Sequence, residues 1–453
     1  MSLCLVTTRP EHMNRITKFR KIIAQSESTE PEGYFHVHDD EPAISSRNET
    51  AKYTHFDQFP GYQVLQKRKI EAQKNNISMP FFLTNESINN DRISINNREY
   101  INFSGYNYLG LSGHKYVSDA AKNAIDKYGT SVSASRIVSG QIPLQIELER
   151  VISNFLGVDD CIVFVSGYCT NVTTIGHLFR RGDLVIHDNH AHNSIQTGCQ
   201  LTKAQRLIFP HNNWDKLEEL LRIHRQEYHR VLIVLEGTYS MDGNIPDVRR
   251  AIDIKQRYDA LLMIDEAHSL GVIGEKGGGI GEYFSIDRKN VDIWMGSLSK
   301  SFASCGGFIA GNQALIEYMK YSTPGFIFSV GLSPSDAAAA LAAFELIQRE
   351  PERVKSLHRN TLLFLELAKQ HGLDTGLNSG TPIVPIVIGN TISCMQLSQR
   401  LFELGIHVQP IIYPAVMQND ARLRFFITSL HTEKQIRYTV SMLAQVLTKL
   451  EKR

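Results

Sequence analysis

The first feature of the sequence that could take part in a reaction is an apolar run that ends in an acid. Residues 261–264 are Leu-Leu-Met-Ile, Asp265 and Glu266 follow, and His268 lies three residues beyond Asp265. A carboxylate at the end of a buried strand pairs with a buried cation, because an unpaired buried charge is costly. A structural strand end or a metal ligand of a nucleotide-binding enzyme is the alternative. The phosphate-binding pattern GxxxxGK[ST], which would favour that enzyme class, does not occur in the sequence.

A lysine among small residues is the second such feature. Lys300 lies between Ser299 and Ser301, closely after Ser297 and 35 residues after Asp265. Desolvation lowers the pKa of an amine and makes it a nucleophile toward an aldehyde, and the neighbouring hydroxyls are suited to bind a phosphate. A lysine in such a loop is usually an exposed surface residue, but the 35-residue spacing from Asp265 favours a chemical role for Lys300.

Two further patterns are suited to bind anions. Ser166, Gly167 and Tyr168 follow an apolar run and open a helix-like segment, and free backbone N–H groups at a helix N-terminus attract an anion. The structural alternative is an ordinary strand-to-helix turn. Arg422 and Arg424 alternate along residues 421–428, so they share one face of a strand, where a guanidinium binds a carboxylate through two bonds. The alternative is that both arginines are surface charges.

The elements that position these residues alternate along the chain. Helix-like segments at 144–156, 214–227 and 248–258 lie among short apolar runs, which predicts an α/β fold with a mostly parallel central sheet and helices on both faces. Such a sheet binds ligands at the carboxyl ends of its strands. The predicted strands cover residues 161–165, 183–186, 230–235, 261–264, 291–295 and 307–310.

The predicted organisation has four parts. Residues 1–80 form an N-terminal extension, 81–130 an N-terminal segment, 131–345 the large cofactor-binding domain and 346–453 a smaller C-terminal α+β domain. The extension contains two helical candidates, at 15–23 and 62–74. The first is basic and amphipathic, so we expect either an arm packed on the body or a peripheral contact with a membrane or an acidic partner.

Composition excludes several classes of protein. The chain has 453 residues and a net charge of +1, so no strong field attracts nucleic acid. No apolar run approaches the roughly 20 residues of a transmembrane helix. Six scattered cysteines without a CxxC pair favour neither a metal site nor a disulfide framework, and they suit a reducing cytoplasm. We therefore expect a cytoplasmic protein without a transmembrane segment or a metal.

Eight motifs carry a resemblance to a known family. The chain resembles the α-oxoamine synthases, a family of fold-type I transferases that depend on pyridoxal 5′-phosphate (PLP) and include serine palmitoyltransferase, 8-amino-7-oxononanoate synthase and 5-aminolevulinate synthase. Any one motif is weak, but all eight occur in the order of the family. They lie at residues 102–110, 135–140, 166–171, 188–194, 209–212, 236–243, 265–268 and 297–300.

The resemblance implies a role for each matched residue. Lys300 would hold PLP and move the substrate proton, Asp265 would pair with the pyridine nitrogen, and His192 would stack on the ring. Arg422, with Tyr106 or Asn107, would bind the carboxylate of the amino acid. The remaining cofactor contacts would come from Ser166, Gly167, Tyr168, Ser240, His268, Ser297 and, from the neighbouring subunit, Ser329.

The implied activity is the decarboxylative condensation of a small amino acid with an acyl thioester of coenzyme A or of an acyl-carrier protein. The products are an α-amino ketone and CO2, and the implied assembly is a homodimer. Three stretches resemble serine palmitoyltransferase more than 8-amino-7-oxononanoate synthase, and this resemblance implies serine ahead of alanine and glycine. They are residues 106–108, residues 265–271, and residues 299–301 with Gly306 and Gly307. Three alternatives stay open: an aminotransferase or aldolase-type lyase on the same fold, a non-catalytic partner subunit, and an ordinary binding module.

Overall fold

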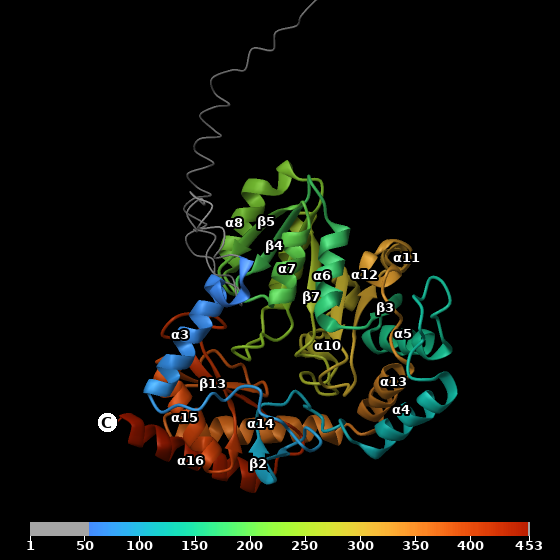
Figure 1. Ribbon diagram of the computed structural model, residues 1–453. Helices are drawn as coiled ribbons and strands as arrows, with labels where there is room; N and C mark the ends of the chain where they lie inside the picture. Colours follow the sequence, from blue (N-terminus) through green and yellow to red (C-terminus); the bar gives the residue numbers. More distant parts are fainter. Residues whose placement is uncertain (1–53, 452–453) are drawn as a thin grey trace, which may run out of the picture.

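The computed structural model describes residues 54–451, which form a large domain around a central sheet and a smaller domain beside it (Figure 1). The large sheet has seven strands in the order β3-β9-β8-β7-β6-β4-β5. Only β9 runs antiparallel to its neighbours, so the predicted mostly parallel sheet is confirmed. The strands are β3 (Asp160–Phe164), β4 (Leu184–Asp188), β5 (Gln205–Phe209), β6 (Val231–Glu236), β7 (Leu261–Asp265), β8 (Ile293–Ser297) and β9 (Gly307–Gly311).

Helices cover both faces of this sheet, because its strands are apolar on both sides. One face packs against α6 (Gly167–Leu178), α7 (Asn193–Leu201), α11 (Gln313–Ser322) and α12 (Pro324–Ile327). The other face packs against α5 (Pro143–Leu156), α8 (Trp214–His224), α9 (Val248–Arg257) and α13 (Pro334–Arg349), with α4 (Lys115–Tyr128) on α13. Short helical pieces add α10 (Gly279–Tyr283), η4 (Arg225–Glu227) and η5 (Arg288–Asn290).

The carboxyl ends of the parallel strands are where apolar sequence gives way to acids. All six residues of β6 are buried, and that strand ends at Glu236. The adjacent strands β4 and β7 end at Asp188 and Asp265. Parallel neighbours place these ends at one edge of the sheet, so three acids that are far apart in sequence meet there.

The smaller domain combines the C-terminal part of the chain with an N-terminal hairpin. Strands β10 (Ile383–Gly389), β13 (Ala421–Phe426) and β12 (Gln409–Ile411) form one sheet, and β1 (Arg92–Ile95), β2 (Arg98–Asn102) and β11 (Ile406–His407) form another. Helices α14 (Glu352–Gln370), α15 (Thr391–Glu403) and α16 (Glu433–Glu451) pack on them around a second core. The β1–β2 hairpin thus pairs the predicted N-terminal segment (81–130) with the predicted C-terminal domain (346–453). The boundaries of these parts stay predictions.

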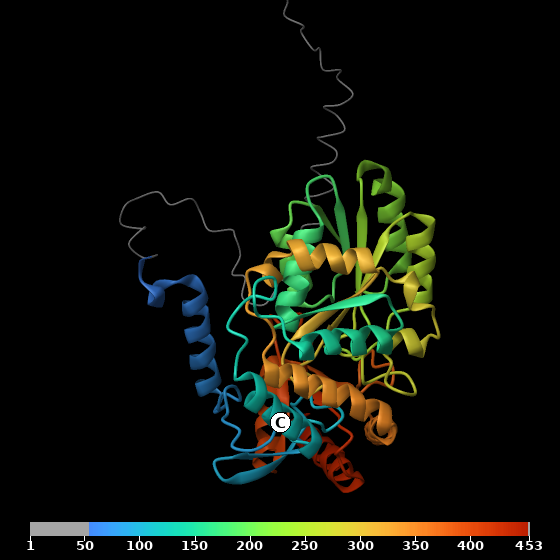
Figure 2. The same ribbon diagram turned by 90° about the vertical axis from the view of Figure 1, so that its right-hand side faces the viewer.

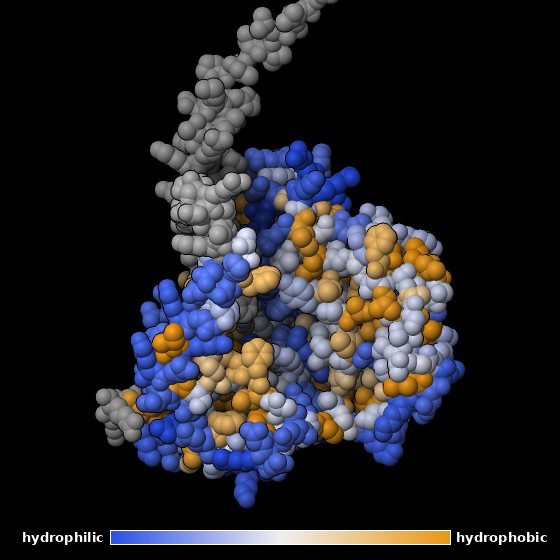
Figure 3. Space-filling model, in the orientation of Figure 1, coloured by the Kyte–Doolittle hydropathy of each residue, from blue (hydrophilic) through white to orange (hydrophobic). Residues whose placement is uncertain are grey.

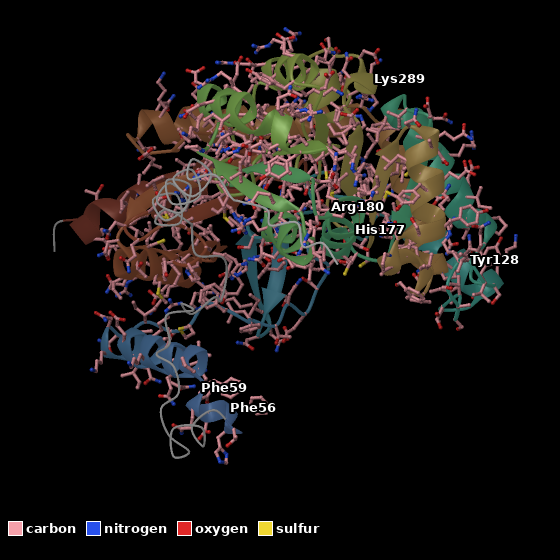
Figure 4. The ribbon with its side chains drawn as sticks, turned by 90° about the horizontal axis from the view of Figure 1, so that it is seen from above. Phe56, Phe59, Tyr128, His177, Arg180 and Lys289 are labelled. Carbon is pink, nitrogen blue, oxygen red and sulfur yellow. The ribbon has the colours of Figure 1, made fainter. Side chains whose placement is uncertain are left out.

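The N-terminal arm stands apart from the body. Helix α3 (Pro60–Lys74), preceded by η3 (Phe56–Gln58), lies at the edge of the molecule, as Figure 2 and Figure 4 show. Ala72 is its one buried residue, and Arg68 contacts the ring of Tyr413 in the small domain. The predicted helix at 62–74 is confirmed by α3, whereas the basic helix predicted at 15–23 lies outside the described residues. Within residues 54–451 no helix is long and apolar enough to cross a membrane.

Candidate active site

A cavity of about 240 Å3 opens at the carboxyl edge of the large sheet. Its walls come from the ends of β6, β7 and β8, from the start of α6, and from the loop before α7. Eight residues predicted for the site line it together, although they are spread over 135 positions of the sequence. They are Ser166, Gly167, Tyr168, His192, Asp265, His268, Ser297 and Lys300.

Lys300 follows β8 and lines this cavity. Burial lowers the pKa of its amine, while the charges of Asp265 and Glu236 oppose that shift. A lowered pKa gives the amine a larger neutral fraction near neutral pH, and the neutral amine is the form that attacks an aldehyde or accepts a proton. The structure therefore places a nucleophilic amine where the sequence predicted one.

Asp265 is buried, and two donors hold its carboxylate. Asn171 Nδ2 donates to Oδ2 at 2.7 Å, and the backbone N–H of Ala267 donates to Oδ1 at 2.9 Å. Asn171 belongs to the first turns of α6, so the helix that opens at the cavity also orients the acid. Hydrogen bonds of this kind favour the charged form of a carboxyl group. These two bonds hold the Asp265 carboxyl group in place at the wall of the cavity.

Two histidines line the cavity in their neutral forms. Burial lowers the pKa of His192, whose Nδ1 lies 2.7 Å from Ser194 Oγ. Burial also lowers the pKa of His268 well below its usual value, and its Nδ1 lies 2.8 Å from the hydroxyl of Tyr108. Burial also raises the pKa of Tyr108, so both partners of this hydrogen bond are neutral. When the phenol donates to Nδ1, the neutral imidazole carries its hydrogen on Nε2.

The start of α6 forms a cradle for an anion. Ser166 caps the helix by accepting a hydrogen bond from Cys169, and the next residue, Gly167, packs tightly on the turn after β8. A Cβ on Gly167 would lie 3.1 Å from Ser297 Oγ, and a Cβ on Gly307 would lie 2.7 Å from Gly167 Cα. Only glycine lets these backbones meet, so helix N–H groups and the serine hydroxyl surround one point.

These residues fit PLP. The helix cradle suits its phosphate, the Asp265 carboxyl group suits a pyridine nitrogen, and Lys300 suits its aldehyde. His268 offers a ring hydrogen to an oxygen substituent, and His192 offers an imidazole to cover the ring. The fit rests on donors, charge and packing of this chain.

Comparison with known proteins agrees with this fit. A model of the family "Aminotransferase class I and II" matches residues 98–443. The 8-amino-7-oxononanoate synthase of Coprothermobacter proteolyticus is 36% identical over 354 residues, which cover 78% of this chain and 90% of that protein. The corresponding enzyme of Fervidobacterium nodosum is 36% identical over 388 residues, 85% of this chain and 98% of its own. The chain belongs to the α-oxoamine synthase family.

Solved structures of this PLP-dependent family superpose closely on the chain. Serine palmitoyltransferase from S. paucimobilis, solved with bound PLP and myriocin, gives a TM-score of 0.83 at 27% identity and covers 86% of this chain and 98% of its own. The serine palmitoyltransferase of Sphingomonas wittichii gives 0.82 at 26% identity, covering 86% and 97%. The fold-type I architecture predicted from the sequence is thereby confirmed.

Arg422 of this synthase lies away from the cavity. Its Nη1 pairs with Asp242, and its Nη2 and Nε bond the side chain and the backbone oxygen of Asp420. Both Arg422 and Asp242 are buried, and the guanidinium already makes three bonds to other residues of the protein. The role implied for Arg422 in substrate binding stays a prediction.

Arg424 is the arginine that sequence reasoning passed over. It shares a face of β13 with Arg422, and its Nη1 donates to Ser240 O at 2.9 Å. Its Nε is buried without a hydrogen-bond partner. The charge of Arg424 lowers the pKa of both Lys300 and His192, which places it near the reactive groups. Because the two arginines share one face of the strand, the sequence pattern alone does not show which of them acts on Lys300 and His192.

Tyr106 lies beside the cavity, whereas Asn107 makes structural hydrogen bonds. The Tyr106 ring meets His268 edge-on, with 6.0 Å between centroids, and is 42% exposed, so it stands beside the cavity. Asn107 is buried, and its amide nitrogen donates to Asn90 Oδ1 at 2.7 Å while its Oδ1 accepts from Ser112 N. Asn107 thus holds a turn, and Tyr106 is the better placed of the two for a ligand.

Ser240 and Ser329 do not line the cavity of a single chain. Ser240 meets Arg424 through its backbone oxygen. Ser329 Oγ donates to Val330 O at 3.2 Å, between the exposed side chains of Phe328 and Val330. Their implied contacts with PLP stay predictions, and the contact of Ser329 requires a second subunit.

Proposed function

We propose that this chain catalyses the decarboxylative condensation of a small amino acid, serine first, with an acyl thioester of coenzyme A or of an acyl-carrier protein, giving an α-amino ketone and CO2. The observation that carries the proposal is the desolvated amine of Lys300 in one cavity with Asp265, His192 and His268. Release of CO2 that requires both substrates tests it.

Each residue of the cavity has its own role in the proposed reaction. Bound PLP supplies an electron sink that makes the α-carbon of the attached amino acid acidic. Lys300 Nζ takes the α-proton and later returns a proton to the product. Asp265 would hold a proton on the pyridine nitrogen, and the imidazole of His268 would donate to the ring oxygen. The N–H groups at the start of α6 bind the phosphate, and the imidazole of His192 covers the ring.

The order of bond changes follows from the substrates. The α-carbon attacks the thioester carbonyl, a carbon–carbon bond forms and the thiol leaves. The resulting β-keto acid loses its carboxyl group as CO2, and protonation at the α-carbon gives the amino ketone. Loss of CO2 is favoured because the new ketone accepts the electron pair. Met295 and Ala267 line the cavity and would help to exclude water from the reacting carbon.

Arg424 is the proposed ligand of the amino acid carboxylate. We expect Arg424→Met to raise KM for the amino acid about 10- to 100-fold, since a hydrogen bond to a charged group contributes about 1.5–3 kcal/mol. Affinity for PLP should stay close to that of the parent. Steady-state kinetics and a PLP titration measure the two effects.

Arg422→Met is the matched comparison. It removes the arginine partner of buried Asp242, which keeps only its contact with His190, so it should lower the free energy of unfolding by up to about 3 kcal/mol. KM of the folded fraction should stay within about threefold of the parent. If KM for the amino acid rises in Arg422→Met and not in Arg424→Met, Arg422 binds the carboxylate of the amino acid instead.

A homodimer is proposed for this synthase. Figure 3 shows hydrophobic residues gathered near α11 and α12. Phe328 is 85% exposed and Val330 46% exposed beside Ser329, and Val138 is 79% exposed on a loop that Gly331 contacts. A twofold arrangement that covers this patch would bring Ser329 to the partner's phosphate site. Sedimentation equilibrium should give twice the mass of one chain. We also propose a cytoplasmic location.

A further inference from the structure

Three buried carboxyl groups meet at the carboxyl edge of the sheet. Strand β6 lies between β4 and β7, and these strands carry Asp188, Glu236 and Asp265 at their ends. Glu236 stands directly opposite Asp265 in the register of β6 and β7. All three are at most 4% exposed. Three anions at this spacing repel one another in a medium of low polarity, so the number of hydrogen-bond donors at each decides which are charged.

Asp188 has three donors. The backbone N–H of His190 donates to Oδ1 at 2.8 Å, and the backbone N–H of Asn212 donates to Oδ2 at 3.0 Å. His211 Nδ1 lies 2.8 Å from Oδ1. These bonds hold the pKa of Asp188 below its usual value despite burial. Asp188 is therefore charged.

Asp265 has two donors, and the Lys300 amine lies nearby. The bonds from Asn171 and Ala267 occupy one carboxylate oxygen each. The charge of Asp265 raises the pKa of Lys300. Each oxygen of Asp265 thus has a hydrogen-bond donor of its own.

Within residues 54–451, one hydrogen-bond donor reaches the side chain of Glu236. The backbone N–H of His192 donates to Oε1 at 2.6 Å. Among the described residues no ion pair of Glu236 is formed. Burial raises the pKa of Glu236 well above its usual value, and the charges of Asp265 and Asp188 add to the shift, while Lys300 opposes it. Glu236 is thus the acid of the three that keeps its proton.

We propose that Glu236 is a positioning residue that works as a neutral carboxylic acid, with Oε1 holding the main chain of His192 at the cavity. The bond to His192 N fixes the loop before α7, and that loop sets where the imidazole stands. Neutrality leaves Asp265 as the charged acid beside Lys300. The role of His192 rests on the function proposed above, whereas the protonation of Glu236 does not.

Glu236→Gln preserves the shape, the neutral charge and the accepting oxygen. We expect kcat/KM within about threefold of the parent, because the hydrogen bond is kept. The pH dependence of the visible absorbance of the holoenzyme should be unchanged. If Glu236 were an anion, its removal would lower the pKa of Lys300 and shift this titration toward lower pH. Such a shift would overturn the proposal.

Glu236→Ala removes the accepting oxygen. We expect kcat to fall by up to about 100-fold while KM for the amino acid changes little, since the loss is one of alignment. Recovery of activity in Glu236→Gln, and not in Glu236→Ala, separates positioning by a neutral acceptor from general destabilisation. Equal loss in both variants, with both folded by circular dichroism, would contradict it.

Infrared spectroscopy of the cofactor-free protein tests protonation without any substrate. The parent should show the carbonyl band of a protonated carboxyl group, and Glu236→Gln should lose it. Glu266 is the matched control, because it is also buried and its pKa is raised to about 7. Glu266→Gln should keep the Glu236 band above that pH. Absence of the band in the parent at alkaline pH rejects the neutral acid, even if the variants do not fold, and leaves the proposed function untouched.

Discussion

Lys300→Ala should reduce turnover by about 100- to 10,000-fold, the range that a positioned general base contributes. The variant loses both the amine that binds the PLP aldehyde and the group that moves the α-proton. Borohydride treatment should fix PLP to Lys300 in the parent and to no residue in the variant. Mass spectrometry of the tryptic peptide that contains residue 300 measures this directly.

A surface lysine provides the control for this experiment. Lys289 lies after α10 with its side chain 65% exposed, pairs with Asp159, and is marked in Figure 4 at the edge of the molecule. Lys289→Ala should keep full activity and the same labelled peptide. Covalent capture of PLP by Lys300→Ala after borohydride would show that another amine is the nucleophile.

Asp265→Asn should reduce turnover by about 100- to 1,000-fold, the size of effect found when one preorganised electrostatic contact is removed. Asparagine keeps the volume and an acceptor for Ala267 N, so the fold should persist. The carboxylate charge that holds a proton on the pyridine nitrogen is lost, and the electron sink weakens. Pre-steady-state kinetics should locate the loss in removal of the α-proton.

Asp215→Asn is the matched charge-neutral change at the surface. Asp215 is 88% exposed at its side chain and pairs with Arg250 on the outer helices. Its substitution should change neither turnover nor PLP binding. Near-normal turnover of Asp265→Asn would remove the electrostatic role assigned to Asp265.

Site residues could be predicted from the sequence where they directly follow an apolar strand. Asp265 follows an apolar strand and Lys300 follows the next one, so parallel pairing alone brings them to one edge. The strand Gln205–Phe209 was missed because it lies at the edge of the sheet and begins with two polar residues. The hairpin β1–β2 was missed because its partner β11 is 300 residues away in sequence.

Long-range pairing explains the errors at the site. Arg422 and Arg424 lie two positions apart on one face of a strand, and the contact of Arg422 with Asp242 distinguishes them in the structure. Glu236 lies inside a motif that the sequence singled out, yet its protonation depends on acids from β4 and β7. Tyr108 and Asn171 orient His268 and Asp265 from other elements. Such partners are set by the fold, and a local pattern does not contain them.

The most direct test of the central claim is the release of CO2 from carboxyl-labelled amino acids by the PLP-loaded protein. Serine, alanine, glycine and threonine are each supplied with acyl-CoA, with acyl-carrier protein, or with no thioester. The proposed function predicts release that requires a thioester, is stoichiometric with the amino ketone formed, and is fastest with serine. Serine giving the slowest release of the four would contradict the serine preference. Turnover of the amino acid with no thioester present, and no CO2 when one is added, would contradict the synthase itself in favour of an aminotransferase or a lyase.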